Sequence, residues 1–315
     1  MNKILKIVLP IPIILILSLL MVYFFQKHTF TAKKTAQFDA LTSLLIVSKA
    51  FDEHGQITLS RLGKDHDGGY MVPDKALEHS DVLLGYGVAN DISFEEQFSQ
   101  RYDKPSYGFD CGVQKITHHD PHFTFVRECI SSDKFLYRNQ QSSDNIRTFT
   151  QQLDQLKLRN KNIFVKMDIE GAEYAAFNDI FQYTPYITGI LIEIHFTQSE
   201  QTEQAIQLIS KLNESFALLH IHGNNCTNQY FSSQHMKGPA PRVLELTYIN
   251  KALVHRIIQA TKQDHPDTTD QTNCPNQPEH TFEITPRVVP STQKRPENTQ
   301  VSRVLRDGTI NTLTE

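Results

Sequence analysis

The chain has 315 residues, of which 39% are hydrophobic, and a formal net charge of −4. This length fits one large domain or two small ones. Nucleic acid is not an expected partner, because no basic excess covers the chain. The four cysteines form no C-x-x-C pair, so neither a zinc ribbon nor a thioredoxin motif is expected. The cysteines neither require nor exclude an oxidising compartment.

The N-terminus is strongly apolar. Residues 7–25 carry only Pro10, Pro12 and Ser18 as interruptions, and a run of about 19 residues suits one membrane-spanning helix. No clear A-x-A cleavage site follows, which disfavours a signal peptide. We therefore predict a single-pass membrane anchor at residues 1–28. Lysines precede and follow the span, so the positive-inside rule leaves its orientation open.

The rest of the chain divides by composition. Apolar residues recur at helical spacing from Phe38 to Leu45, which predicts a juxtamembrane helix or linker at residues 29–55. Residues 256–315 are rich in Pro, Thr, Gln, Asp and Asn, and such a segment buries too little apolar surface to offset its ordering entropy. We predict a disordered polar tail there and a folded domain at residues 56–255.

Strand-like and helix-like patterns alternate through this domain. The expected strands are short apolar runs at residues 81–84, 106–109, 123–130, 163–167, 190–196, 216–221 and 243–249. Helical spacing separates most of them, and Ser143 or Asp144 is the expected cap of a helix carrying Phe149 and Leu153. The alternation predicts an α/β fold with a largely parallel sheet. Only a loop joins the last two strands, so the last strand is expected to be antiparallel.

The segment IFVKMDIEGAEY, residues 163–174, runs from a strand into a cluster of acids and then a helix. Ligands of open α/β sheets sit outside the carboxyl ends of the strands, and carboxylates there serve as bases, metal ligands or hydrogen-bond acceptors. Helix capping is the alternative interpretation, because acids near a helix N-terminus are stabilising. Asp168, directly after the strand, is the candidate for a site.

A glycine turn follows the first expected strand at Gly85, Tyr86 and Gly87. Glycine lets a ligand approach the backbone closely, and the next helix offers its N-terminus. A dinucleotide fingerprint requires a third glycine, but Asn90 stands in its place. Asp91 disfavours a diphosphate and suits a ligand with positive charge. S-adenosylmethionine is such a ligand, because it carries an ammonium and a sulfonium.

Six motifs occur in order within about residues 56–252: DGGYMVP, DVLLGYGVANDISFEEQF, YGFDCG, VKMDIEGAEY, LIEIH and IHGNN. Together they resemble FkbM-type methyltransferase domains. The resemblance implies a Rossmann-like, seven-stranded class I methyltransferase sheet and the use of S-adenosylmethionine. It covers neither the apolar N-terminus nor the polar tail.

The resemblance also implies roles for individual residues. The implied cofactor-binding residues are Gly85, Tyr86, Gly87, Asp91, Asp110 and Asp133. Among them, Asp110 would bind the ribose, as an acid in a nicotinamide site also would, and Asp133 would contact the adenine edge. Asp168 would lie beside the methyl group and the acceptor. Glu173, facing back onto its own helix, is expected to be structural.

Further polar residues are expected near Asp168. Glu193 and His195 are two residues apart on one strand and therefore share a face, as do His220 and His222 on the next. We expect Asp168, Glu193, His195 and His222 to form the catalytic group, with a histidine as general base. A divalent metal held by Asp168, Glu193 and a histidine is an alternative that we do not favour. Simple pairing of Glu193 with His195 is the structural alternative.

The leading hypothesis is a membrane-anchored, S-adenosylmethionine-dependent methyltransferase that acts on oxygen of a small molecule or a glycan. Because the cofactor is made in the cytosol, the cytosolic side is favoured for the folded domain. A non-catalytic binding or scaffold module on the same fold is the alternative. A nicotinamide-dependent oxidoreductase is disfavoured by Asn90, which replaces the third glycine.

Overall fold

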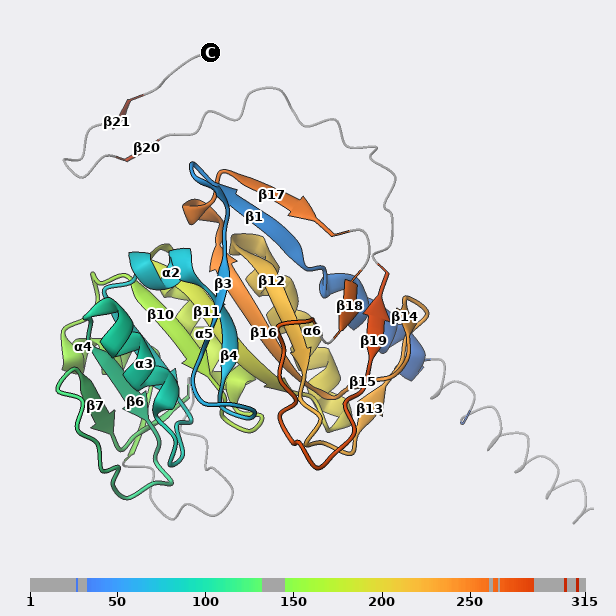
Figure 1. The fold of residues 1–315 in the computed structure, drawn as a ribbon, viewed down its shortest axis with the longest axis horizontal. Helices are drawn as coiled ribbons and strands as arrows, with labels where there is room; N and C mark the ends of the chain where they lie inside the picture. Colours follow the sequence, from blue (N-terminus) through green and yellow to red (C-terminus); the bar gives the residue numbers. More distant parts are fainter. Residues whose placement is uncertain are drawn as a thin grey trace, which may run out of the picture.

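The computed structural model describes residues 27, 33–131, 145–260, 263–265, 267–285, 303–304 and 310–311. A seven-stranded sheet lies at its centre (Figure 1). Its strands are β5 (Val82–Tyr86), β6 (Ser106–Phe109), β7 (Phe123–Val126), β10 (Ile163–Met167), β11 (Ile187–His195), β12 (Phe216–Gly223) and β16 (Val243–Asn250).

The strand order is β12-β16-β11-β10-β5-β6-β7. Strands β11, β10, β5, β6 and β7 pair in parallel, whereas β16 is antiparallel to both β11 and β12. The predicted α/β fold, with a mostly parallel sheet and an antiparallel last strand, is therefore confirmed. The antiparallel pairing follows from the connection between β12 and β16, which contains no crossover helix.

Helices cover both faces of the sheet. They are α2 (Asp74–His79), α3 (Ser93–Tyr102), α4 (Phe149–Leu156), α5 (Glu173–Ile180), α6 (Ser199–Ser215) and the 3-10 turns η2 (Phe181–Tyr186) and η3 (Lys251–Leu253), with residues 33–44 also helical. Alternation along β10 sends Val165 into the core beneath α4, α5 and α6, and Phe164 into the core beneath α2 and α3. Figure 1 shows α2 and α3 on the near face.

Shorter strands surround the sheet. They are β1 (Ser48–Asp52), β2 (Gly55–Gln56), β3 (Leu59–Leu62), β4 (Tyr70–Pro73), β8 (Cys129–Ile130), β9 (Ile146–Arg147), β13 (Tyr230–Phe231), β14 (Met236–Lys237), β15 (Ala240–Pro241), β17 (Arg256–Gln259), β18 (Gln263–His265), β19 (Phe282–Ile284), β20 (Arg303–Val304) and β21 (Ile310–Asn311). The β3–β4 hairpin matters most for the site, because β4 packs against β11, β12 and β16.

The start of α4 differs from the prediction. Its cap is Thr148, whose side-chain oxygen accepts from the backbone N–H of Gln151 while the Gln151 side chain accepts from the N–H of Thr148. The predicted caps Ser143 and Asp144 lie outside the described residues. Because this reciprocal capping needs a residue pair three apart, Thr148 and Gln151 were the available sequence signal.

The prediction of a membrane-spanning helix requires correction. Within the part of the chain that the structure describes, no helix is both long enough and apolar enough to cross a membrane. The predicted span at residues 7–25 lies outside that part. The helical residues 33–44 are not free of the domain, since Phe38 and Leu41 are buried in its main core.

The polar C-terminal segment also differs from the expectation of a disordered tail from residue 256. Strand β17 pairs with β1, and β19 pairs with both β14 and β18. Cys274 forms a disulfide with Cys226, which lies in the loop after β12. Pairing with distant strands and a covalent link hold the described residues 256–260, 263–265 and 267–285 to the domain, and neither is visible in composition.

Candidate functional site

Four polar side chains form a row across neighbouring strands at one end of the sheet. Glu245 on β16 is the direct cross-strand partner of Glu193 on β11 and of His222 on β12. Asp168 comes directly after β10, which pairs with β11. Residues directly opposite each other project from the same face. We call Asp168, Glu193, Glu245 and His222 the polar row. Asp168 and Glu193 are neighbours in it, whereas Glu245 separates His222 from Glu193.

His195 links this row to the turn after β10. Its Nδ1 lies 3.0 Å from Oε1 of Glu173, and its Nε2 lies 3.2 Å from Oε1 of Glu193 and 3.3 Å from Oε2 of Glu170. Burial alone would lower the pKa of His195, but the hydrogen bonds to Glu173 and Glu193 outweigh it and raise the pKa to about 11. At neutral pH the ring is an imidazolium, which has no lone pair to accept a proton.

Glu173 shapes the turn that carries Asp168. Its Oε1 accepts the backbone N–H groups of Ile169 at 3.3 Å and Gly171 at 3.0 Å. Glu170 and Gly171 have φ of 56° and 97°, a left-handed region in which glycine is the least strained residue. The side chain of Glu173 is fully buried. These contacts match its predicted structural role.

Asp168 has one satisfied and one unsatisfied oxygen. The hydroxyl of Tyr70, on β4, donates to Oδ2 at 3.4 Å. Oδ1 is buried and has no hydrogen-bond partner among the described residues. Burial is the main reason that the pKa of Asp168 rises to about 6, with the negative charges of Glu170 and Glu173 adding to it. At neutral pH Asp168 is therefore mostly ionised, and its Oδ1 is a buried acceptor without a donor among the described residues.

Glu193 is a buried acid next to Asp168. The amide of Asn224 donates toward its two oxygens at 3.4 and 3.3 Å. Burial, followed by the charge of Asp168, raises the pKa of Glu193 to about 8, although His195 opposes this rise. Both acids therefore hold a proton more readily than exposed carboxyls, and they titrate as a pair.

Glu245 is held from two sides. Its Oε2 lies 3.1 Å from Nδ1 of His222, and its Oε1 accepts from the side-chain amide of Asn273 at 2.5 Å. The same amide donates to Oδ1 of Asp67 at 3.4 Å. Burial alone would lower the pKa of His222, but Glu245 raises it to about 9. His222 is thus a second imidazolium in the site.

Two sets of side chains have donor atoms within 4.8 Å of one another, as in metal sites: Asp168 with Glu193 and His195, and Asp67 with Glu193 and Glu245. In the first set, Nδ1 of His195 faces Glu173 and Nε2 faces Glu193, so a metal at Nε2 would have to replace the proton that the ring now shares with Glu193. In the second set, amide N–H groups of Asn224 and Asn273 already donate to the acids. Imidazolium and amide donors compensate these carboxylates.

The glycine turn lies directly against the turn after β10. The backbone N–H of Asp168 donates to the carbonyl of Tyr86 at 3.0 Å, and that of Gly87 donates to the carbonyl of Phe109 at 2.9 Å. Gly87 has a φ of 77°, and a Cβ there would collide with the carbonyl of Asp168. Only glycine therefore permits this approach of β5 to β10.

Tyr86 and Gly85, which are expected to line the cofactor, have structural contacts of their own. The ring of Tyr86 is buried and stacks on Phe109 with 4.7 Å between centroids, so only its backbone can face a ligand. A Cβ on Gly85 would collide with the carboxyl of Glu95, which lies 3.8 Å from the ammonium of Lys166. Gly85 is thus required for packing beneath the turn.

Asp110 is fixed at the end of β6 by backbone donors. The N–H groups of Ala89, at 2.9 Å, Gly112, at 2.8 Å, and Val113, at 3.2 Å, donate to its carboxylate. A carboxylate oxygen accepts more than one hydrogen bond, so Asp110 can still bind hydroxyls. Asp110 and the unsatisfied oxygen of Asp168 are therefore the candidate groups for ribose hydroxyls and for a positive charge.

The other expected cofactor residues have different outcomes. Asp91 forms an ion pair with Lys64 at 3.0 Å and accepts the N–H of Ser93 at the start of α3. Burial would raise the pKa of Asp91, but the contacts with Lys64 and Ser93 lower it. Its contacts are therefore those of a turn-capping residue. Asp133 lies outside the described residues.

Three residues of the site were not assigned a catalytic role from the sequence: Tyr70, Glu245 and Asn273. Glu245 had a signal, because it interrupts the apolar strand VLELTYIN, and a charged residue inside a buried strand is rare without a partner. Asn273 had none, because it lies in a segment whose composition predicts disorder.

The comparisons with known proteins agree with this geometry at the family level. The profile of the family described as the Methyltransferase FkbM domain matches residues 70–230, just over half of the 315 residues. Among solved structures, the chain is similar to that of the plantazolicin methyltransferase BpumL in complex with SAH, at 12% identity and a TM-score of 0.23, over 73% of this chain and 88% of that chain. This similarity is too low to support an argument. The search of curated proteins gave no match.

Proposed function

The chain belongs to the FkbM methyltransferase domain family, and from this premise we propose that it transfers a methyl group from S-adenosylmethionine to an oxygen atom of a small molecule or a glycan. The observation that supports this most is the position of Asp168. Its backbone is bonded to the glycine turn, and its carboxylate has a buried, unsatisfied oxygen beside the polar row.

The cofactor half of the proposed site is the space between the ends of β5, β6 and β10. Asp110 would accept the ribose hydroxyls, and the absence of a side chain at Gly87 would let the methionine part approach the backbone. S-adenosylmethionine supplies a methyl group bonded to a positively charged sulfur. The carboxylate of Asp168 favours such a charge nearby, because opposite charges attract most strongly where water is excluded.

The acceptor half contains the polar row. We assign Asp168, not a histidine, as the general base that takes the proton of the acceptor hydroxyl at Oδ1. The raised pKa of about 6 keeps this group ionised at neutral pH and still basic enough to be effective. His195 and His222 are protonated instead, and their raised pKa values suit them to hold Glu193 and Glu245 in place.

Calorimetry with S-adenosylhomocysteine and the full chain tests the cofactor assignment. We expect binding that is lost in Asp110→Ala and kept in Asp154→Ala, which removes an exposed carboxylate from α4. A panel of glycans and hydroxylated small molecules, with a labelled methyl group, then tests transfer. Binding of NADH in place of S-adenosylhomocysteine would overturn the proposal. Cofactor binding without transfer to any acceptor would favour a non-catalytic module.

A further inference from the structure

We infer that residues 270–278 form a wall of the acceptor half of the site, that Asn273 is the positioning residue of this wall, and that the Cys226–Cys274 disulfide keeps it in place. The inference rests on the proposed function, because it assigns this wall to the acceptor side. Residue 273 also lies beyond the segment matched by the family profile, residues 70–230.

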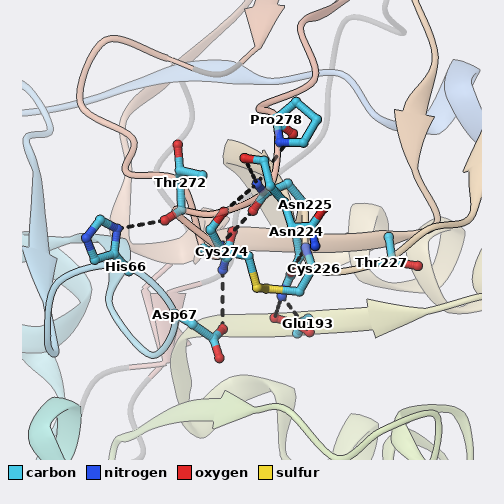
Figure 2. The surroundings of a disulfide bond; sticks show 12 residues. His66, Asp67, Glu193, Asn224, Asn225, Cys226, Thr227, Thr272, Cys274 and Pro278 are labelled. Atoms are coloured by element: carbon cyan, nitrogen blue, oxygen red, sulfur yellow. Dashed lines mark hydrogen bonds between the residues drawn. A yellow bond between two sulfur atoms is a disulfide. The ribbon is translucent and has the colours of Figure 1, made fainter.

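Asn225 binds the backbone of this wall. Its amide nitrogen lies 3.1 Å from the carbonyl of Cys274, 3.2 Å from that of Gln277 and 3.5 Å from that of Pro278. Its side-chain oxygen accepts the N–H of Cys274 at 2.8 Å. Figure 2 shows Asn225 beside the disulfide, with these contacts converging on it. Asn225 is 2% exposed, so the contacts are shielded from water.

The opposite edge of the wall contacts the loop before β4. The N–H of His66 donates to the side-chain oxygen of Gln271 at 3.1 Å, and Nδ1 of His66 lies 2.8 Å from the carbonyl of Thr272. The wall thus bridges the end of β12 and the loop that carries Asp67 (Figure 2). Asp67 is one of the three acids of the second set described above, with Glu193 and Glu245.

Asn273 connects the wall to the acids Glu245 and Asp67. It is 3% exposed, and its amide donates to Glu245 at 2.5 Å and to Asp67 at 3.4 Å. A neutral group with two N–H donors can hold two carboxylates that would otherwise repel each other. Glu245 belongs to the polar row and lies opposite Glu193. The position of Asn273 therefore affects the polar row through its contact with Glu245.

The disulfide adds a covalent link to the hydrogen bonds that hold the wall. Residues 275–278 are exposed, and the segment contains few apolar side chains. Cys274 follows Asn273 directly, and its link to Cys226 joins positions 48 residues apart. A cross-link of this kind restricts the open states of the chain. Disulfides persist in oxidising compartments, which disagrees with the cytosolic side favoured from cofactor supply.

The second disulfide provides a matched control. Cys111 and Cys129 are joined over 18 residues, and Cys111 directly follows Asp110 in the cofactor half. The two bridges therefore brace different halves of one site. Loss of the Cys226–Cys274 bridge should change the acceptor half, whereas loss of the Cys111–Cys129 bridge should change the affinity for the cofactor.

Hydrogen exchange on the full chain tests the wall. In Cys226→Ser/Cys274→Ser we expect the rate of hydrogen exchange at residues 267–279 to rise by at least about tenfold, because the locally open state becomes about tenfold more populated. Dithiothreitol should reproduce this in the wild type, since it gives two electrons and two protons to the bridge and becomes a cyclic disulfide. Unchanged exchange in the variant, or an equal rise in Cys111→Ser/Cys129→Ser, would overturn the inference.

Asn273→Ala tests the positioning role without an acceptor. We expect the NMR titration midpoint of the His222 ring to move by about 0.5 pH unit or more, because Glu245 faces His222 and loses a donor. Gln277→Ala, an exposed control, should leave it unchanged. S-adenosylhomocysteine affinity should stay within about twofold in both variants, since the cofactor half is intact. An unmoved His222 midpoint contradicts the positioning role, whereas absence of cofactor binding in the wild type contradicts the proposed function alone.

Once an acceptor is found, the same variants are expected to separate kinetic terms. Asn273→Ala should lower kcat/KM for the acceptor by about tenfold or more, as expected for a misplaced acceptor, and leave KM for the cofactor unchanged. If Asn273→Ala raised KM for the cofactor by the same factor by which it lowered kcat/KM for the acceptor, its role would be generally structural. That result would contradict the assignment to the acceptor half.

Discussion

Glu193 and Glu245 are direct cross-strand partners on β11 and β16, and they are only 5% and 4% exposed. Two acids placed opposite each other in a sheet are destabilising unless something compensates them. Here His195 lies beside Glu193 and His222 beside Glu245, and both rings are held in the protonated form. The sheet therefore carries a compensated set of charges at the end where a ligand would bind.

Removal of the carboxylate of Asp168 should abolish most of the transfer activity. For Asp168→Asn we expect kcat to fall by about 10²–10⁴-fold, the usual contribution of a general base, with S-adenosylhomocysteine affinity changed by only a few fold. The measurement is labelled methyl transfer beside calorimetry, and Asp154→Asn is the control. Full activity in Asp168→Asn would exclude Asp168 as the base.

Transfer should depend on pH in the direction set by Asp168. Burial raises the pKa of this carboxyl to about 6, and the base is active only when ionised. A profile of kcat/KM against pH should therefore rise through about pH 6 and level off above it. A fall in activity through the same range would instead indicate an essential protonated acid.

The ion pairs of His195 should stabilise the fold most strongly at low pH. The pKa of His195 is raised in the folded state from its ordinary 6.5 to about 11, so its contribution is complete below about 6.5 and is lost as the pH rises toward 11. We expect His195→Gln to lower the free energy of unfolding by about 3–5 kcal/mol at pH 6, as when one partner of a buried pair is removed. Urea unfolding at pH 6 and pH 10 should show a smaller loss at pH 10.

A matched control for His195→Gln is His54→Gln, because His54 is exposed. Its free energy of unfolding should change by less than about 0.5 kcal/mol at both pH values. A loss in His195→Gln that does not depend on pH would mean that packing, not charge, is the contribution of the ring.

Substitution of Gly87 should affect stability and cofactor binding together. A Cβ there would collide with the carbonyl of Asp168 at a φ of 77°, so Gly87→Ala should lower the free energy of unfolding by about 1–3 kcal/mol and weaken S-adenosylhomocysteine binding. Gly55→Ala is the control, because Gly55 also has positive φ but open space around it. Equal effects of the two substitutions would exclude contact with Asp168 as the cause.

Chelation of divalent metals should leave transfer unchanged, because imidazolium and amide groups already compensate the acids. Transfer assayed with EDTA, and again after addition of Mn²⁺ or Mg²⁺, measures this. A loss with EDTA that Mn²⁺ restores would assign Asp168 and Glu193 to a metal instead.

The sequence alone determined the local features of this protein. Short apolar runs predicted the strands Ser106–Phe109 and Ile163–Met167 with the bounds that the structure has, and the missing crossover helix predicted the antiparallel last strand. The glycine turn and the acid Asp168 were recognisable because turn chemistry and strand ends depend on residues close together in the chain. Composition was less informative at the ends, where it predicted a membrane span and a disordered tail from residue 256.

Only the tertiary structure decided how these parts combine. Insertion of β16 between β11 and β12 puts Glu245 between Glu193 and His222, and non-local strand pairing of this kind has no signature in a single sequence. The same holds for the partner of each cysteine and for the contact of Asn273 with Glu245. The charge of His195 likewise depends on burial beside Glu173 and Glu193. A histidine expected from the sequence to be a base is an imidazolium because the fold surrounds it with carboxylates.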